Sequence, residues 1–242
     1  MASKQQINIV WLKRDLRSQD HLPLQLAEES GLPYLIIFVF EPLMMDYPDT
    51  SLRHLQFQYQ SLLQLNKKWT AYNKEVIIFN TDMITVLETI KSQFTIKTIY
   101  SYQESGIQLT YDRDKLIKQY CKENQIEWKE FQSDGIIRGI KNRLGWDKHW
   151  YATMHNSVIV NQFKAQEALL FQNPYPLNND LIKSFNTYPK TYQPAGEDFA
   201  FKYLETFITG RGQNYSRHIS KPSESRVKTQ ISLDGNQKAS KA

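Results

Sequence analysis

The most densely charged stretch of the chain follows directly after its first apolar run, residues 7–11 (INIVW). Two chemistries fit such a stretch. The charges can pair with one another and hold a loop, or they can line a binding crevice or a contact between domains. The composition favours the first chemistry and leaves the second open. The ionisable side chains concerned are Lys13, Arg14, Asp15, Arg17, Asp20 and His21.

Other motifs that carry chemistry are absent or isolated. The sequence contains no glycine-rich dinucleotide motif, no phosphate loop, no zinc-protease motif and no nucleophile elbow. Its five histidines are scattered, and no carboxylate stands at metal-ligand spacing from His149 and His155. We therefore expect no metal site. Cys121 is the single cysteine, which excludes an internal disulfide and fits a reducing, cytoplasmic setting.

Five short apolar runs predict the strands that would position the charged segment. The run at residues 34–40 (YLIIFVF) has no polar alternation, so both of its faces should be buried. Helical patterns separate the runs, and this alternation is typical of a parallel sheet with helices on both faces. We predict an α/β fold with a Rossmann-like parallel five-stranded sheet. The predicted strands are residues 7–11, 34–40, 75–80, 98–102 and 126–131.

Three helical patterns lie between these strands. Apolar residues recur at spacings of three, four or seven over residues 52–72, which indicates one face of a long helix. Asp82 is expected to cap a second helix. A third helix is expected after Thr110. It would turn three side chains toward the sheet, namely Leu116, Ile117 and Tyr120.

The pattern changes at residue 135. The following residues are rich in Gly, Trp, Pro and Asn and show no clear period, which predicts a connector. A helical pattern resumes at residues 197–209 and ends at Gly210. The expected domains are an α/β domain at 1–134, a connector at 135–195, the truncated start of a helical domain at 196–226 and a polar tail at 227–242.

The positive charge of the chain is concentrated near its C-terminal end. Residues 1–210 hold 23 Lys and Arg and 23 Asp and Glu, so the net charge of +5 lies in the last 32 residues. This favours an acidic partner such as nucleic acid for that end only, although a solvated tail has the same composition. Because no apolar run of about 18 residues exists, we expect no membrane partner. We also expect the chain to be a monomer.

The opening segment WLKRDLRSQDHLPL (residues 11–24) resembles the first motif of the DNA photolyase and cryptochrome family, R-x-D-L-R-x-x-D-N/H-x-x-L. Similar segments follow in order up to residue 226. They are the R-x-x-F-x-x-x-S-L-x-x-L helix (Arg53, Phe57, Ser61, Leu62, Leu65), the Arg113–Asp114 pair, GWDKHWYATM (residues 145–154) and FITGRGQNYSRHISKPSESR (residues 207–226).

The resemblance implies a Rossmann-like domain that often holds an antenna chromophore, a folate or a deazaflavin, and a larger helical domain that holds FAD. In such photolyases, light-excited reduced FAD donates an electron to a pyrimidine dimer flipped out of DNA, whereas cryptochromes use the flavin for signalling. Tyr215 matches a family tyrosine that contacts the FAD phosphate. In family members a basic residue after that tyrosine often approaches DNA, and Arg217 lies near the corresponding position. No catalytic residue can be assigned, and the opening motif is expected to be structural.

The chain departs from the family after Arg226. Family chains are about twice as long, and a Thr-Ser-x-x-x-Leu-Ser segment is replaced by Val227, Lys228 and Thr229. We therefore expect a frameshifted or shortened photolyase that binds FAD weakly or not at all and is inactive alone. Two alternatives stay open: a cryptochrome-type photoreceptor, and a non-catalytic α/β module that binds an antenna or a nucleotide.

Overall fold

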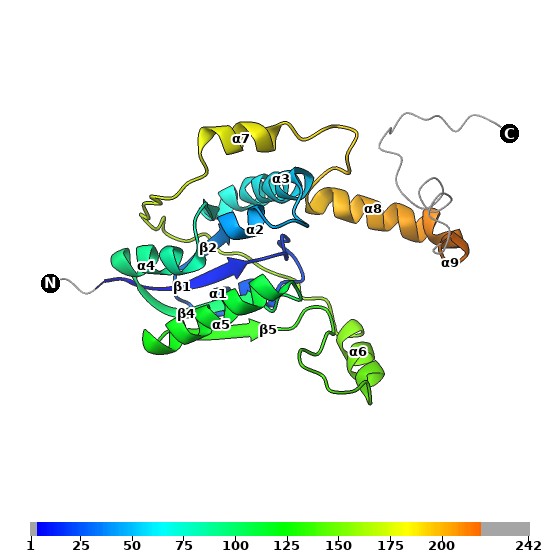
Figure 1. The fold of residues 1–242 in the computed structure, drawn as a ribbon, viewed down its shortest axis with the longest axis horizontal. Helices are drawn as coiled ribbons and strands as arrows, with labels where there is room; N and C mark the ends of the chain where they lie inside the picture. The colour runs from blue at the N-terminus through cyan, green and yellow to red at the C-terminus, as the bar shows by residue number, and fades with distance from the viewer. Residues whose placement is uncertain (1–3, 219–242) are drawn as a thin grey trace. The chain divides into compact units, whose positions relative to one another are not determined.

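The computed structural model describes residues 4–218 of the 242-residue chain and contains a five-stranded parallel sheet of order β3-β2-β1-β4-β5 (Figure 1). The predicted α/β fold and its parallel sheet are confirmed. The strand β4 begins at Thr95 rather than at Thr98. The strands are β1 (Gln6–Leu12), β2 (Tyr34–Val39), β3 (Val76–Phe79), β4 (Thr95–Tyr102) and β5 (Glu127–Phe131).

The helices fall into two compact units. Unit 1 comprises Met1–Ser51 and Leu65–Asn178, and unit 2 comprises Leu52–Gln64 and the chain from Asn179 onward. Among residues 4–218, no helix has the length and apolar character needed to cross a membrane. The helices are α1 (Leu22–Glu29), α2 (Pro42–Met45), α3 (Leu52–Trp69), α4 (Met83–Gln93), α5 (Gln108–Glu123), α6 (Trp146–Met154), α7 (Asn179–Asn186), α8 (Glu197–Thr209) and α9 (Tyr215–His218), with 3-10 turns at Thr70–Tyr72 and Arg211–Asn214.

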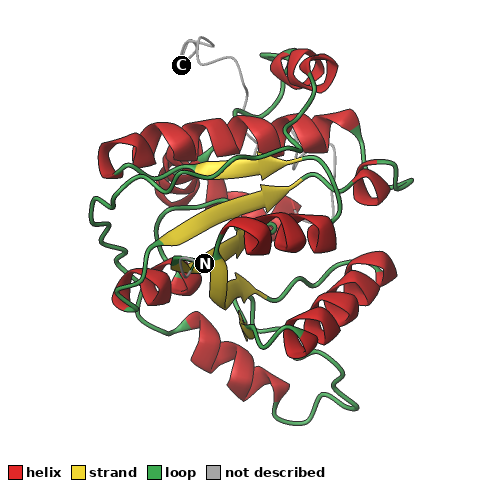
Figure 2. Ribbon diagram, turned by 90° about the vertical axis from the view of Figure 1, so that its left-hand side faces the viewer, coloured by secondary structure: helices red, strands yellow, loops and turns green. Residues whose placement is uncertain are grey.

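The core of unit 1 is built around the central strand β1. Successive strand side chains point to opposite faces, so Ile7, Ile9 and Trp11 lie in one cluster with the buried residues of α4 and α5. Val10 and Leu12 are buried on the other face, where α1 packs against β1 and β4. Figure 2 shows the twisted sheet in yellow with helices on both sides. The buried run of β2 agrees with the prediction for residues 34–40.

Two helix boundaries test the sequence patterns. Asp82 caps α4, where its Oδ1 accepts a hydrogen bond of 2.9 Å from the Thr85 backbone N, as predicted. The prediction for α5 was partly wrong. The helix begins at Gln108, so Thr110 lies inside it. Ile117 and Tyr120 are buried, but Leu116 is 61% exposed because its position is rotated about 100° from that of Ile117 around the helix axis.

Residues 135–195 contain two helices that the sequence patterns did not predict. Trp146, Trp150 and Met154 recur every four residues in α6, but its nine residues are fewer than the window over which a helical period is recognised, and none of them is buried. The helix α7 has eight residues and buries Phe185 alone. Between them the chain forms no helix or strand and packs on the sheet of unit 1. Asn80 donates a backbone hydrogen bond of 2.8 Å to Tyr175 O, and the rings of Phe79 and Phe171 lie 5.8 Å apart.

Unit 2 is held by the first part of α3 and the residues after Asn179. Gln56 Nε2 donates to Ser184 O at 2.9 Å, and the rings of Tyr59 and Phe185 lie 5.5 Å apart. The helix predicted at residues 197–209 is α8 with the same bounds. Of the apolar side chains at helical spacing in α8, Tyr203 and Phe207 are half-buried, whereas Phe199 and Ile208 are exposed. The expected tail at 227–242 and residues 219–226 lie outside the described residues.

Candidate functional site

The strand order places one topological switch point between β1 and β4. In open parallel sheets, ligands bind outside the carboxyl ends of the strands at such a point. Lys13 and Arg14 follow β1 directly, Glu41 follows β2, and Glu104 follows β4. The charged segment of the sequence therefore lies at the expected place, together with carboxylates from two neighbouring strands.

Arg113, from α5, is the hub of an ion-pair network at this edge. Its guanidinium lies 3.0 Å from Glu41 Oε2, 2.8 Å from Glu104 Oε2 and 2.8 Å from Asp114 Oδ1. The same group lies 4.8 Å from the ring centroid of Trp11. One planar cation thus links the strands β2 and β4 to the helix α5 above the end of β1.

Lys13 forms the second centre of the network. Its ammonium lies 3.2 Å from Asp114 Oδ2 and 3.4 Å from Glu130 Oε1, and its side chain is 3% exposed. The nitrogen also lies 4.3 Å from the ring of Trp11 and 5.1 Å from that of Trp128. A buried charge needs such partners, because an isolated ammonium in a protein interior is strongly destabilised.

Two further arginines close the network at its rim. Arg14 Nε donates to Glu104 Oε1 at 2.7 Å, although the Arg14 side chain is 64% exposed. Arg138 lies 3.8 Å from Asp114 Oδ2 and donates to the backbone oxygen of Glu104. We call this set of eight charged residues the carboxyl-edge network. It has four cations and four carboxylates and therefore carries no net charge. Its members are Lys13, Arg14, Arg113, Arg138, Glu41, Glu104, Asp114 and Glu130.

The pKa values in the network follow burial and the position of Arg113. Burial raises the pKa of Glu41 above its usual value, and Arg113 offsets only part of that rise. Burial also raises the pKa of Glu104, but Arg113 and Arg14 outweigh it, so this pKa lies below its usual value. Burial lowers the pKa of Arg113, and three carboxylates more than reverse the effect. The charges are thus satisfied internally, and the network offers no surplus cation to a phosphate group.

The remaining charges of the opening segment hold the loop. Asp15 Oδ2 lies 2.6 Å from His21 Nε2, and His21 Nδ1 accepts from the Leu24 backbone N at 3.2 Å, capping α1. Since Nδ1 is an acceptor here, the proton of a neutral ring lies on Nε2 and points to Asp15. Burial raises the pKa of Asp15, but its hydrogen bond to His21 brings it below the usual value.

The segment after α6 secures the same loop. Asn161 Oδ1 accepts from the His21 backbone N at 2.9 Å, and Asn161 Nδ2 donates to His21 O at 2.9 Å. Arg17 Nη2 lies 3.8 Å from Asp20 Oδ2 and donates to Asp20 O at 2.8 Å. Arg14, Asp15, Arg17 and Asp20 therefore hold the loop, as the favoured interpretation states, but only Arg17 and Asp20 pair with each other.

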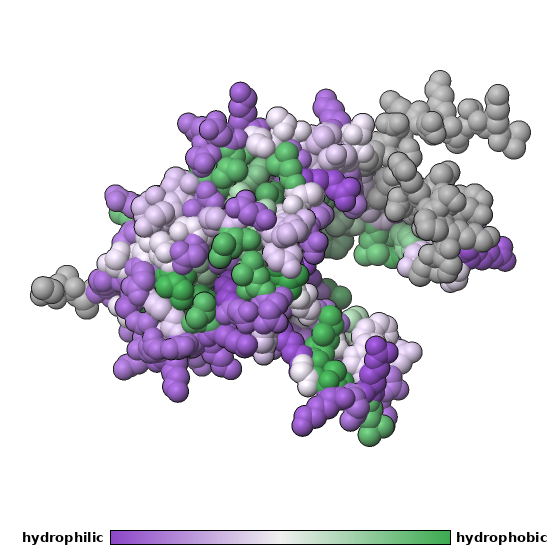
Figure 3. Space-filling view, in the orientation of Figure 1, coloured by the Kyte–Doolittle hydropathy of each residue, from purple (hydrophilic) through white to green (hydrophobic). Residues whose placement is uncertain are grey.

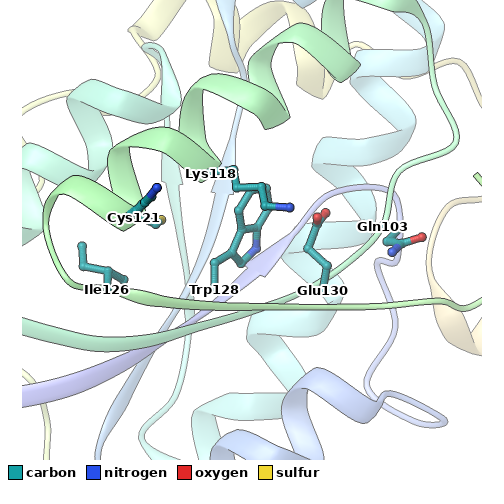
Figure 4. A pocket seen from close by; sticks show the side chains of 7 residues that line it. Gln103, Lys118, Cys121, Ile126, Trp128 and Glu130 are labelled. Carbon is teal, nitrogen blue, oxygen red and sulfur yellow. The ribbon is translucent and has the colours of Figure 1, made fainter.

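A shallow pocket lies between α5 and the edge strand β5 (Figure 4). Its volume is about 380 Å³. Trp128 Nε1 donates to Ser101 Oγ at 3.0 Å, and Glu130 is engaged by Lys13, so both polar groups already have partners. Burial raises the pKa of the Cys121 thiol to about 11, which leaves it protonated and a poor nucleophile. The lining residues are Gln103, Lys118, Cys121, Lys122, Ile126, Trp128 and Glu130.

The two residues matched to cofactor and DNA contacts lie in unit 2. Tyr215 begins α9 and is 44% exposed, with its ring 5.6 Å from that of Phe207. Arg217 is exposed on the same short helix. An isoalloxazine ring needs an enclosed apolar site. In α8 only Glu197 is buried, and the turn at Arg211–Asn214 buries nothing, so these two elements by themselves form no such enclosed apolar site beside Tyr215.

The network also contains functional candidates that the sequence did not single out. Glu41 and Glu104 were missed, although each follows a predicted strand within two residues, and that position at a strand end is a usable signal. Arg138 was missed because nothing in the connector marks it. Within residues 4–218, no cluster of His, Cys, Asp and Glu side chains has the geometry to hold a metal ion.

Comparisons with known proteins agree with this architecture. The family described as DNA photolyase matches residues 8–139, which is more than half of the chain. No curated protein sequence matches. The structure is similar to a bacterial class III photolyase from Agrobacterium tumefaciens, with a TM-score of 0.68 and 18% identity over 90% of this chain and 47% of that one. It is also similar to a Synechocystis cryptochrome, with a TM-score of 0.66 and 18% identity over 93% and 49% of the two chains.

An archaeal photolyase from Sulfolobus tokodaii, described with two FAD molecules, also matches, with a TM-score of 0.61 and 18% identity over 78% of this chain and 44% of that one. The chain thus spans about half the length of each of these solved structures. At this identity the likeness concerns the fold, and it places the five-stranded unit in the α/β part of such proteins.

Proposed function

The chain belongs to the DNA photolyase family, and we propose that it provides the α/β domain of a light-driven, FAD-dependent protein that repairs pyrimidine dimers in DNA. One observation carries this proposal: the family match at residues 8–139 coincides with the five-stranded sheet and its ion-pair network. In this proposal DNA is the partner, FAD is the cofactor, and a folate or deazaflavin antenna belongs to the α/β domain.

We further propose that the 242-residue chain alone retains little or no FAD. Tyr215 is the single proposed flavin contact, and it stands half-exposed on a helix of four residues. The carboxyl-edge network has a structural role, because its cations and carboxylates neutralise one another and hold β1, β2, β4 and α5 together. FAD, when bound to the whole protein, would supply the electron that splits the dimer.

Purification of the chain and a blue-light assay on irradiated oligonucleotides test both statements. We expect a preparation without the absorbance of a stoichiometric flavin and without repair. A stoichiometric flavin with repair would mean that the chain itself is the photolyase, and the proposed lack of FAD would be wrong. A stoichiometric flavin without repair would favour the cryptochrome alternative, which has support from the similar fold of the Synechocystis protein.

A further inference from the structure

The helix α6 and the loop before it expose aromatic side chains that a folded chain usually covers. We call residues 135–156 the α6 module. None of the residues of α6 is buried. Trp146 is 38% exposed, Tyr151 57% and Leu144 92%. A nine-residue helix is marginal in water unless tertiary contacts hold it, so this exposure calls for an explanation.

The α6 module also carries a net positive charge, unlike the rest of residues 1–210. It carries Arg138, Lys141, Arg143 and Lys148 against Asp147, a net charge of +3, whereas the rest of residues 1–210 carries −3. Arg138 belongs to the carboxyl-edge network. The other three cations are exposed, and none of them forms an ion pair with a described residue. The neutral balance of residues 1–210 therefore conceals a local positive surface.

One contact within the module and one with the preceding residues hold α6 in place. Gly135 has φ +70°, and a Cβ placed there would lie 3.1 Å from Trp150 Cδ1, so the indole packs directly on that backbone. His149 Nε2 lies 2.9 Å from Gln132 Oε1, which ties α6 to the residue that follows β5. Trp150 thus serves as an anchor, and Trp146 and Tyr151 remain at the surface with ring centroids 6.4 and 5.2 Å from it.

We infer that the α6 module is a binding surface for single-stranded nucleic acid. Such surfaces combine cations that track the phosphates with aromatic rings on which unpaired bases stack. The exposed cations Lys141, Arg143 and Lys148 and the exposed rings of Trp146 and Tyr151 lie within eleven residues of one another in the sequence. Figure 3 shows hydrophobic and hydrophilic patches next to each other on the surface over α6. A protein partner fits less well, because the centres of protein interfaces are depleted in charged residues.

This surface goes beyond the proposed repair activity and does not depend on it. It lies in unit 1, whereas Arg217, the DNA contact carried over from the family, lies in unit 2. It uses no flavin and no light. Binding of an undamaged single strand in the dark therefore tests the surface separately from dimer repair.

The test measures fluorescence anisotropy of a labelled oligothymidylate of about 15 nucleotides with the full chain, in the dark. The charge variant Lys141→Glu with Arg143→Glu is compared with Lys97→Glu and Lys118→Glu, a control pair that makes the same charge change on exposed positions of β4 and α5. The first variant should bind about tenfold more weakly or worse, and its salt dependence should be smaller by about 1.4 in log–log slope. The control should stay within about twofold of the parent chain.

A second pair of variants tests stacking without changing charge. Tyr151→Ala should weaken binding about tenfold, whereas Tyr151→Phe, which keeps the ring, should leave it unchanged. Circular dichroism checks that both variants fold. We expect both to fold, because the Tyr151 side chain is 57% exposed. Equal weakening by the two charge pairs, or unchanged binding by Tyr151→Ala, overturns the proposal. A third result would also overturn the proposal: the parent chain binds no oligonucleotide but self-associates, and Tyr151→Ala abolishes the self-association. The surface would then bind a second copy of the chain.

Discussion

At the scale of single residues, Arg113 does most to organise the carboxyl edge. Its guanidinium contacts Glu41, Glu104 and Asp114, which come from three parts of the chain. The planar group with several donors suits this role, whereas a lysine has one compact charge. The three carboxylates are each less than 10% exposed at their side chains, so each depends on a neighbouring cation.

Replacing Arg113 with methionine should lower the free energy of unfolding by about 3 kcal/mol at neutral pH, because it leaves buried carboxylates without their main partner. Arg14→Met is the matched control, since Arg14 bonds to the same Glu104 but is 64% exposed, and it should cost less than about 1 kcal/mol. Urea unfolding measures both. Burial already raises the pKa of Glu41, so this carboxylate becomes protonated in mildly acidic buffer more readily than an exposed one. The loss of unfolding free energy caused by Arg113→Met should therefore be smaller in acid. Equal losses from the two variants would contradict the role of Arg113 as hub.

At the scale of elements, side-chain caps set where the helices of the sheet domain begin. His21 caps α1 through Nδ1, and Asp82 caps α4 through Oδ1. The family motif has Asn or His at the position of His21, and asparagine is a common capping residue, which gives a physical reason for that choice. A histidine cap also reaches Asp15, so it joins the start of the helix to the loop that follows β1.

Replacing Asp82 with alanine should cost about 1 kcal/mol of stability at neutral pH, because the Thr85 backbone N loses its acceptor. Burial raises the pKa of Asp82, but bonds from Thr85 bring it below the usual 3.8. The carboxylate therefore stabilises the fold fully above about pH 4, and this stabilisation is lost as the pH falls through the folded-state pKa.

Urea unfolding of the parent and Asp82→Ala chains across this pH range checks the sign, since the difference between them should narrow in acid. Asp82→Asn is the control, because it keeps an acceptor oxygen and cannot ionise. It should cost less than Asp82→Ala at neutral pH. A cost of Asp82→Ala that grows in acid would show that the cap works in a different way.

At the scale of the whole molecule, stability should be distributed unevenly. The central strands β1 and β4 are almost entirely buried, whereas α6 has no buried residue and α8 buries only Glu197. Regions with few buried apolar contacts open at low free energy, independently of global unfolding. The part that the family match covers is therefore expected to be the stable part of the described chain.

Hydrogen exchange measured by mass spectrometry should show the slowest exchange in peptides from β1 and β4. Peptides from α6 and α8 should exchange far faster under native conditions, because these helices open without disrupting the core. Peptides from α5, which buries five of its residues, provide an internal reference for a well-packed helix. Exchange of α6 as slow as that of β1 would contradict this distribution of stability.

The sequence by itself determined the parallel sheet, the buried β2 and the cap at Asp82. Apolar period and capping chemistry are local properties, so a short window of residues is enough to recognise them. It also pointed to the carboxyl end of β1 as the place where charges gather.

Only the tertiary structure decided which charges pair. Arg113 meets Glu41 across 72 positions of sequence, and Asn161 meets His21 across 140, and no local pattern encodes such partners. The helix α6 was missed for a different reason, because its nine residues are fewer than the window over which a helical period is recognised. Local spacing specifies elements, whereas packing brings distant residues within bonding distance, and the chemistry of this edge depends on those distances.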